Sequence, residues 1–270
     1  MNEQEYNAAE GVRRSDLWKM EDSPEKFKYY LEHPVEQTPA MAFGSACHKM
    51  ILEPETFGDE YCIAPDADRR TNAGKAIWAE FTEQNAGKTV ITQKDSELMA
   101  EMEAALESCT LAYGLIRGEG QSEVSLFWTD PETGEKCKAK LDRLVKDEDG
   151  KYVIIDYKTA RAAETNRFNH EIFSLGYHFQ AGFYTEGLMN SLGLNYRPRF
   201  IFVAQEKTAP YAVNVIEVTD DVMKIGVAKF HELLEKYVEC KTVDLWPGYC
   251  DDTPNETQLP GWYMSEEEDV

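Results

Sequence analysis

Residues 139–159 read AKLDRLVKDEDGKYVIIDYKT, and the turn-forming residues DEDG separate two largely apolar runs in this stretch. The pattern predicts two strands that pair through the turn. Side chains alternate along a strand, so Asp156 and Lys158 should point to the same face. A carboxylate and an ammonium on an apolar strand are costly unless they are paired or functional. Asp142 lies on the preceding strand, and pairing would bring it close to Asp156.

The same pattern of alternating side chains and turns continues on both sides of this stretch. It predicts a preceding strand that forms a hairpin through PETG, and two later strands. The predicted strands are 123–130, 135–147, 151–159, 200–205 and 211–218. The predicted helices are 15–31 with a possible break at Pro24, 41–52, 74–81, 94–113, 166–192 and 220–237. This order predicts an α/β fold with a central sheet and helices on its faces.

Length and composition indicate one large domain, or a domain with an added lobe. The chain has 270 residues, of which 42% are hydrophobic, enough for a substantial core. We expect a single domain over 1–250, with a mainly helical part (1–115) and a sheet core (120–240). The segment 251–270 carries seven acidic residues and no basic residue, and is expected to be an acidic tail. With no long apolar run and no secretory leader pattern, we expect a cytoplasmic protein without membrane contact.

The formal net charge of −22 is unusual for a protein that binds nucleic acid, since neutralisation of phosphates dominates such binding. The charge is unevenly distributed, however. Residues 136–161 contain eight Lys or Arg against five Asp or Glu. A local basic surface can therefore lie on an acidic body, which favours a confined binding channel over tight non-specific binding.

Convergent carboxylates beside a lysine suit metal-assisted hydrolysis of a phosphodiester. Glu123 opens the first strand of the predicted meander and could reach the same end of the sheet as Asp142 and Asp156. Mg²⁺ prefers oxygen ligands and keeps positions for water and a substrate phosphate. It activates water and offsets the charge that grows in the transition state. Lys158 could stabilise that charge, or position and deprotonate the water.

Four short motifs in this order resemble those of a known superfamily. Asp142 followed by Asp156-x-Lys158 resembles the PD-(D/E)xK nucleases, and LDRL followed by IIDYKT is similar to the RecB-type nuclease motif. Residues 180–184 (QAGFY) match the QxxxY pattern that accompanies this motif, and residues 44–48 (GSACH) resemble the G-x-x-x-H helix. The motifs span about 140 residues of the chain, and are specific only when taken together.

This resemblance implies a restriction-endonuclease-like core with a mixed central sheet flanked by helices. It also implies a site that holds one or two Mg²⁺ or Mn²⁺ ions. The implied metal ligands are His48, Asp142, Asp156 and the backbone carbonyl of Tyr157. The implied catalytic residues are Asp142, Asp156, Lys158 and Glu123. Histidine is unusual for Mg²⁺ but suits Mn²⁺, and a lone histidine in an apolar helix is otherwise a core residue.

The chain further resembles the RecE-type exonucleases and their phage relatives, in residues 11–31 (GVRRSDLWKMEDSPEKFKYYL) and 68–78 (DRRTNAGKAIW). This closer resemblance implies a 5′ to 3′ exonuclease that acts on linear double-stranded DNA and leaves 3′ single-stranded overhangs for recombination. It also implies assembly as a homo-oligomeric ring, and a RecT-like single-strand annealing protein as partner.

Several further residues are candidates for substrate binding. Gln180 and Tyr184 lie one helical turn apart and share a face, so they could orient the substrate or brace the Asp156 strand; ordinary packing of the helix against the sheet is the alternative. Ser15, next to Arg14, opens a predicted helix, and helix N-termini bind anions such as a 5′-phosphate; helix capping by Ser15 is the simpler alternative. Arg69, Arg70 and Lys75 lie in a predicted loop and are candidates for contact with the DNA backbone; a solvated polar loop is the alternative.

Two alternative functions remain open at this stage. One is a Cas4-like or helicase-associated nuclease; those commonly carry one early and three late cysteines around an iron–sulfur cluster. Here the six cysteines are scattered, and only Cys240 and Cys250 are late. The other is a non-catalytic acidic protein that mimics DNA, which the charge of −22 motivates.

Overall fold

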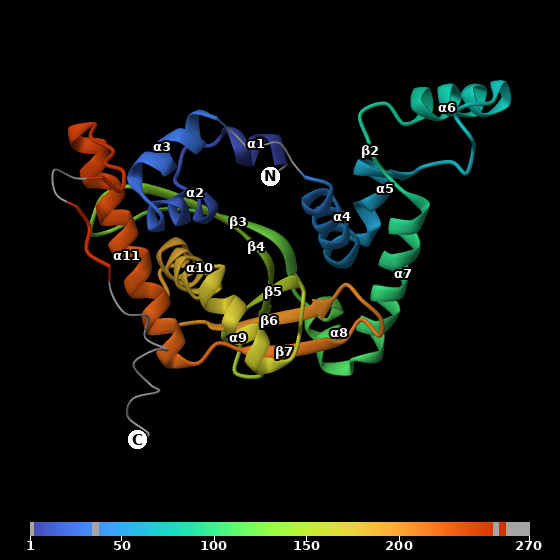
Figure 1. The fold of residues 1–270 in the computed structure, drawn as a ribbon. Helices are drawn as coiled ribbons and strands as arrows, with labels where there is room; N and C mark the ends of the chain where they lie inside the picture. Colours follow the sequence, from blue (N-terminus) through green and yellow to red (C-terminus); the bar gives the residue numbers. More distant parts are fainter. Residues whose placement is uncertain (1–2, 34–37, 251–253, 258–270) are drawn as a thin grey trace, which may run out of the picture.

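The computed structural model describes residues 3–33, 38–250 and 254–257. A five-stranded mixed sheet lies at its centre, in the order β3-β4-β5-β6-β7 (Figure 1). The strands are β3 (Gln121–Thr129), β4 (Lys136–Lys146), β5 (Tyr152–Ala160), β6 (Arg199–Glu206) and β7 (Val213–Glu217). Only β5 and β6 are parallel, and the other neighbours are antiparallel. The predicted strands and the mixed α/β fold are thus confirmed.

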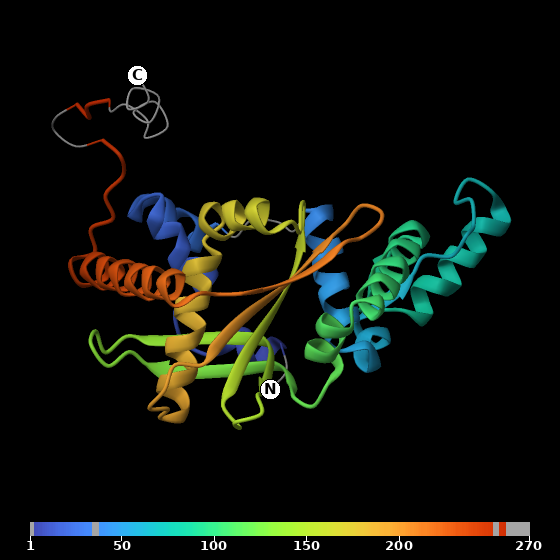
Figure 2. The same ribbon diagram turned by 90° about the horizontal axis from the view of Figure 1, so that it is seen from below.

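Helices cover both faces of the sheet, and each face has its own apolar core. The larger core packs against α2 (Arg14–Leu17), η1 (Trp18–Glu21), α3 (Pro24–Glu32), α9 (Thr165–Ser174), α10 (Tyr177–Leu192) and α11 (Asp220–Val243). The core on the other face packs against α4 (Pro39–Leu52), α7 (Gln93–Ser108) and α8 (Thr110–Arg117). The short helix α1 (Glu3–Ala8) precedes these elements. Figure 2 shows the two groups of helices on either side of the sheet.

A projecting arm extends from the second group of helices. It consists of α5 (Pro54–Glu60), β1 (Tyr61–Ile63), α6 (Asn72–Gln84) and β2 (Thr89–Ile91). Strands β1 and β2 form a short parallel pair that the sequence pattern did not predict. Helix α6 points away from the sheet, and Gly74 is its only buried residue (Figure 1).

Two predicted helices are each divided in the structure. The predicted helix 166–192 is wrong, because Gly176 interrupts it with a φ of +68° between α9 and α10. A Cβ on Gly176 would lie 2.5 Å from the ring of Trp18, so glycine is required for space as well as conformation. The predicted helix 94–113 ends at Cys109, where α8 begins a new direction. Among the described residues, no helix is both long and apolar enough to span a membrane.

The sheet opens into a fork between β4 and β5. Their paired region extends only from Arg143 opposite Ile155 to Lys146 opposite Tyr152, whereas β5 continues along β6 to Ala160. The alternation of side chains along β4 is interrupted at the same place. Leu141 and Leu144 contribute to the same core although they are three residues apart. Strand β4 therefore bends away from β5 at Asp142, and the second half of β5 has one open edge.

Candidate metal centre

Two carboxylates, Glu123 and Asp142, meet at the mouth of this fork, and a third, Asp156, is buried on the neighbouring strand. Counting one residue beyond the pair Arg143–Ile155 places Asp142 opposite Asp156. Glu123 faces Asp142 from β3, between the pairs Ser122–Arg143 and Val124–Leu141. Asp142, Asp156 and Glu123 thus come from three adjacent strands at one level of the sheet, as the sequence predicted for the two aspartates.

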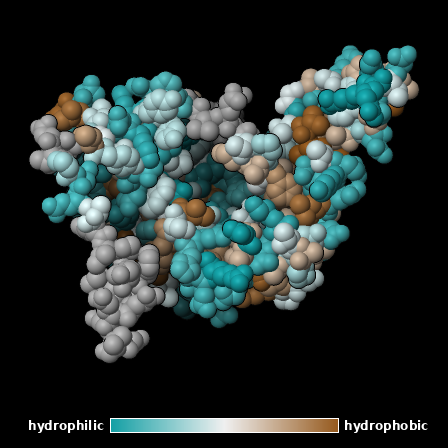
Figure 3. All heavy atoms as spheres, in the orientation of Figure 1, coloured by the Kyte–Doolittle hydropathy of each residue, from teal (hydrophilic) through white to brown (hydrophobic). Residues whose placement is uncertain are grey.

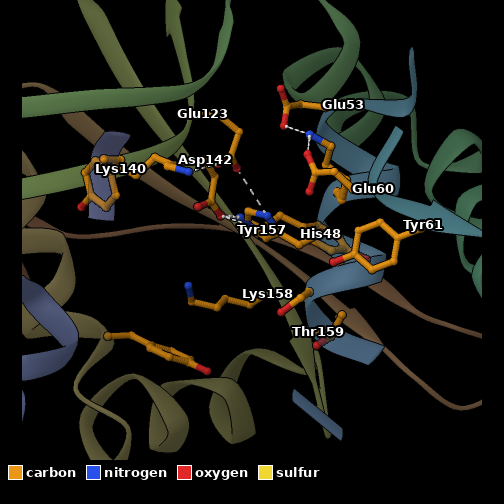
Figure 4. Close-up of a pocket in the computed structure, with 15 residues that line it drawn as sticks. His48, Glu53, Glu60, Tyr61, Glu123, Lys140, Asp142, Tyr157, Lys158 and Thr159 are labelled. Carbon is orange, nitrogen blue, oxygen red and sulfur yellow. Dashed lines mark hydrogen bonds and ion pairs between the residues drawn. The ribbon is translucent and has the colours of Figure 1, made fainter. Parts of the chain in front are cut away.

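Glu123 reaches this position through an unusual backbone conformation. Its φ is +53°, in the left-handed region that residues other than glycine rarely adopt. Such a conformation costs of the order of 1–3 kcal/mol, and persists only where the surroundings impose it. The residue interrupts the β3–β4 ladder, and its carboxylate points toward Asp142 and His48 (Figure 4).

His48 connects the carboxylates of Asp142 and Glu123. Its Nε2 is 2.8 Å from Oδ2 of Asp142, and its Nδ1 is 3.5 Å from Oε1 of Glu123. One ligand atom from each of these three residues lies within 4.8 Å of the others, and within the described residues no other group of His, Cys, Asp or Glu meets this condition. The donor set, an imidazole nitrogen with carboxylate oxygens, fits Mn²⁺ well and Mg²⁺ through its oxygens.

Asp142 also replaces a missing strand partner. Its Oδ2 accepts a hydrogen bond of 2.9 Å from the backbone N–H of Tyr157, at the point where β4 no longer pairs with β5. The N–H and C=O of one residue in a strand point to the same side. The carbonyl of Tyr157 therefore also faces the open edge of the fork, beside Asp142. This geometry is consistent with the predicted role of that carbonyl as a metal ligand.

Asp156 and Lys158 share a face of β5, as predicted. Lys158 Nζ lies 2.5 Å from Oδ2 of Asp156, and the two side chains are 19% and 1% exposed. The other oxygen of Asp156 accepts a hydrogen bond of 2.5 Å from Nε2 of Gln180 on α10. Gln180 is itself buried, so the structure places it behind Asp156, where it braces the carboxylate. Tyr184, one turn later, is partly buried against the larger core.

The charges of the site are strongly coupled. Burial and the charge of Asp142 raise the pKa of Asp156 to about 6, although Lys158 opposes this rise. Burial alone would raise the pKa of Asp142, but the charges of His48 and Lys158 lower it below its ordinary value. Burial disfavours the cationic forms of His48 and Lys158, yet the neighbouring carboxylates outweigh burial and raise both pKa values. The carboxylates thus strongly favour the presence of positive charge at the site.

The centre lies in an open cavity of about 820 Å³. The cavity is lined by residues of α1, α4, α5, α10 and the strands β1, β3, β4 and β5. Figure 3 shows a largely hydrophilic hollow between the surfaces formed by α1–α3 and by α4–α5. The residues that line the cavity are Tyr6, Gly44, Ser45, His48, Lys49, Glu53, Glu60, Tyr61, Glu123, Lys140, Asp142, Tyr157, Lys158, Thr159 and Tyr177.

Ten of these fifteen lining residues were not among the sequence candidates, and Lys140 and Tyr6 are two of the ten. Lys140 Nζ lies 3.3 Å from Oε2 of Glu123 and 5.3 Å from the ring centroid of Tyr6. Helix α1 is held in place by Lys138, whose ammonium donates to the carbonyls of Tyr6 (2.9 Å) and Asn7 (3.2 Å). Lys140 comes two residues before Asp142, so the alternation of side chains along β4 could have predicted that both point to the same face. No local signal indicates Tyr6, which lies more than 130 residues earlier.

Arg14 and Ser15 occupy positions that differ from the prediction. The N-cap of α2 is Arg13, with no side-chain cap, so Ser15 does not cap the helix, which was the alternative to anion binding. Ser15 is exposed on α2, a helix of only four residues. The guanidinium of Arg14 donates to the carbonyls of Leu175 and Gly176 at 2.7 Å each, and so holds the junction of α9 and α10. Neither side chain lines the cavity.

The three predicted DNA-backbone contacts lie on the arm and not at the metal centre. Arg69 stacks over the ring of Trp78 at 3.5 Å from its centroid. Arg70 forms an exposed ion pair with Asp68 at 3.0 Å. Lys75 lies on α6 and lines, with Arg69, a separate shallow cavity. The structure therefore does not bring Arg69, Arg70 or Lys75 to the carboxylates, and their binding of DNA stays a prediction.

Comparison with solved structures shows a shared fold. A protein from Eubacterium rectale, provisionally named an exonuclease, superposes with a TM-score of 0.59 at 14% identity, over 100% of this chain and 99% of that chain. Lower TM-scores are found for the protein SSO0001 (0.39, 12% identity, 89% of this chain and 90% of that one) and for LHK-Exo in complex with dAMP (0.26, 19% identity, 74% and 93%). At these identities the likeness concerns the fold alone.

The sequence itself matches a known domain family. No curated protein matches the chain. The family described as "PDDEXK-like domain of unknown function (DUF3799)" matches residues 14–256, a range that includes every residue of the fork. This match confirms the resemblance to the PD-(D/E)xK superfamily, while the closer resemblance to RecE-type exonucleases stays a prediction. The chain belongs to the family of PDDEXK-like domains DUF3799.

Proposed function

We propose that this protein is a nuclease that hydrolyses phosphodiester bonds of DNA with the help of a divalent cation. One observation carries the proposal: His48, Glu123 and Asp142 converge within 4.8 Å at the mouth of a fork in the sheet, beside Asp156 and Lys158. This combination of carboxylate and imidazole ligands with the cationic side chain of Lys158 suits the hydrolysis of a phosphate ester.

The residues of the fork divide into ligands and supporting groups. His48, Glu123, Asp142, Asp156 and the carbonyl of Tyr157 would hold the cation. A cation bound there would activate water and offset negative charge on the phosphate. Asp142 is fixed by its hydrogen bond from Tyr157, and Asp156 by its hydrogen bond from Gln180. Rigid ligands of this kind reduce the reorganisation needed when the substrate binds.

Lys158 supplies positive charge to the substrate phosphate. The neighbouring carboxylates raise its pKa, so its ammonium stays protonated at neutral pH. This charge state favours electrostatic stabilisation of the reacting phosphate over deprotonation of the attacking water. The ammonium lies in the cavity, on the same face of β5 as Asp156 and 5.1 Å from the ring centroid of Tyr177.

The finer proposal is a 5′ to 3′ exonuclease of linear double-stranded DNA that leaves 3′ overhangs for recombination, with Mg²⁺ as cofactor. The resemblance to RecE-type exonucleases supports it, and the name given to the Eubacterium rectale protein supports only an exonuclease activity. A homo-oligomeric ring and a RecT-like annealing protein as partner are part of the same proposal. An acidic exterior around a basic lumen would reconcile the net charge of −22 with binding of DNA.

The net charge also favours a second candidate, a non-catalytic protein that mimics DNA. Such a protein has no use for a carboxylate strained into a left-handed conformation, or for a buried Asp156 braced by Gln180. We therefore favour the nuclease. The Cas4-like alternative needs cysteines that converge, and among the described residues the only convergent group of metal ligands contains none.

Digestion of end-labelled linear DNA and closed circular DNA tests the proposal. With Mg²⁺, the wild-type protein should shorten linear duplex and leave closed circles intact, and EDTA should abolish the reaction. Release of a 5′ label before a 3′ label supports the proposed polarity, and the reverse order refutes it. Asp142→Asn should be inactive. No digestion of any DNA by the wild type, with or without EDTA, would overturn the nuclease proposal in favour of the mimic.

A further inference from the structure

The fold does not explain why residue 44, Gly44, is a glycine. It lies in the interior of α4, in ordinary helical conformation, where alanine would stabilise the helix. A Cβ built on Gly44 meets no atom within 4 Å. Neither backbone conformation nor close packing therefore requires the absence of a side chain.

The empty space beside Gly44 belongs to the cavity of the metal centre. Gly44 and Ser45 line this cavity together with His48. Gly44 precedes His48 by four residues, so both lie on the same face of α4, about 6 Å apart along the helix axis. The cavity thus continues from the metal ligands along the surface of α4, over the place where a side chain is missing.

The walls of this extension carry neutral hydroxyl groups. Ser45, Tyr61 and Thr159 line the cavity in addition to Gly44. In Figure 4, Tyr61 and Thr159 lie on the other side of His48 from Glu123. The two acidic side chains at this end, Glu53 and Glu60, are both paired with Lys49, at 2.8 and 2.7 Å. Hydroxyl groups and exposed helix backbone are common partners of the sugar–phosphate chain.

We propose that Gly44, Ser45, Tyr61 and Thr159 form a subsite for the nucleotide that adjoins the scissile phosphate, and that Gly44 provides the clearance for its backbone. The proposal rests on the proposed nuclease function. Glycine allows a ligand backbone to approach a helix more closely than any residue with a Cβ. Glycine at position 44 makes α4 less stable than alanine would, and this position is open to the cavity. The lower stability is consistent with selection for passage of the substrate.

The test uses Gly44→Ala and Gly44→Leu, with Gly114→Ala and Gly114→Leu as matched controls. Gly114 is also inside a helix, is exposed, has no atom within 4 Å of a built Cβ, and does not line the cavity. Three quantities are measured for each variant: the melting temperature, the Kd for Mn²⁺, and kcat/KM on linear duplex DNA.

Gly44→Ala should raise the melting temperature by about 1–3 °C. Gly44→Leu should melt no lower than the wild type and bind Mn²⁺ within about twofold, yet its kcat/KM on DNA should fall roughly 100-fold. The Gly114 variants should digest DNA at the wild-type rate.

An unchanged kcat/KM for Gly44→Leu overturns the inference, and so does a loss that comes with weakened Mn²⁺ binding or a lower melting temperature. A wild-type protein that cleaves no DNA would mean instead that the proposed function has failed.

Discussion

Lys158→Met removes one positive charge from the fork and keeps most of the volume of the side chain. Lys158 Nζ is 2.5 Å from Oδ2 of Asp156, which is 1% exposed, so the change acts mainly on the charge beside this carboxylate. Lys146→Met is the matched control. It lies on the same sheet, at the exposed end of β4, and does not line the cavity.

The expected loss of activity follows from the position of the ammonium. Removal of one preorganised group that stabilises charge in a transition state costs about 10²–10³ in rate, or ~3–4 kcal/mol. Without Lys158, Asp156 also binds its proton more tightly, because the ammonium is what opposes the rise of its pKa. We therefore expect kcat on linear duplex DNA to fall at least ~100-fold, while Lys146→Met stays near the wild-type rate.

The same change alters how the stability of the metal-free protein depends on pH. The pKa of Asp156 is raised to about 6 in the folded protein. A carboxyl group with a raised folded pKa contributes stability that is complete below its unfolded pKa of about 4, and that is lost as the pH rises through the folded value. Two pKa units correspond to about 3 kcal/mol.

In Lys158→Met the folded pKa of Asp156 lies higher still, so this loss extends to higher pH. At about pH 8 the variant leaves a buried carboxylate without its partner, which costs about 3 kcal/mol relative to the wild type. At about pH 5.5 Asp156 is largely protonated in both proteins, and the difference should shrink to about 1 kcal/mol or less.

Single-turnover digestion of end-labelled DNA measures the activity, and urea unfolding in EDTA at the two pH values measures the stability. Near-normal cleavage by Lys158→Met would refute the catalytic role of the lysine. A destabilisation of equal size at both pH values would refute the coupling of Lys158 to Asp156, even if activity were lost.

Four further predictions concern the ligands and their support. His48→Ala should weaken Mn²⁺ binding at least ~10-fold in calorimetry, and an unchanged titration would assign His48 to the core. Since the pKa of His48 is raised and only a neutral imidazole binds a metal, Mn²⁺ binding to the wild type should release a proton; identical heats in two buffers that differ in ionisation enthalpy would contradict this. Glu123→Gly should raise the free energy of unfolding in EDTA by about 1 kcal/mol, because relief of the φ of +53° should exceed the loss of the ion pairs of Glu123 with His48 and Lys140. It should also weaken Mn²⁺ binding; a less stable variant would show that these ion pairs outweigh the strain. Gln180→Leu should lower kcat about 10-fold with little change in KM, because Asp156 loses a hydrogen bond but the cavity wall is unchanged; an increase in KM alone would favour contact of Gln180 with the substrate.

The central residues of the site could be predicted from the sequence because their placement depends on residues that are close together in the chain. Alternation along a strand places Asp156 and Lys158 on one face, and the short DEDG turn places Asp142 opposite Asp156. Both arrangements follow from neighbouring residues. The contribution of His48 depended on the resemblance to known motifs, since nothing in the apolar helix α4 indicates that its histidine meets the sheet.

The errors arise where distant contacts decide the structure. Gly176 divides the predicted long helix because its backbone is left-handed and Trp18 leaves no room for a Cβ, a contact with a residue far away in the sequence. The sequence also does not place Arg69, Arg70 and Lys75, whose contact with DNA stays a prediction, relative to the carboxylates. The structure puts them on the arm of α6, and no local pattern specifies the direction in which an arm projects.

Crystals of the wild-type protein grown with Mn²⁺ test the central claim most directly, because the anomalous signal locates the ion independently of any activity. We expect a peak between Nε2 of His48 and the carboxylates of Glu123 and Asp142, with bonds of about 2.0–2.3 Å. No peak at this position in saturating Mn²⁺, with His48 still hydrogen-bonded to Asp142, would contradict it.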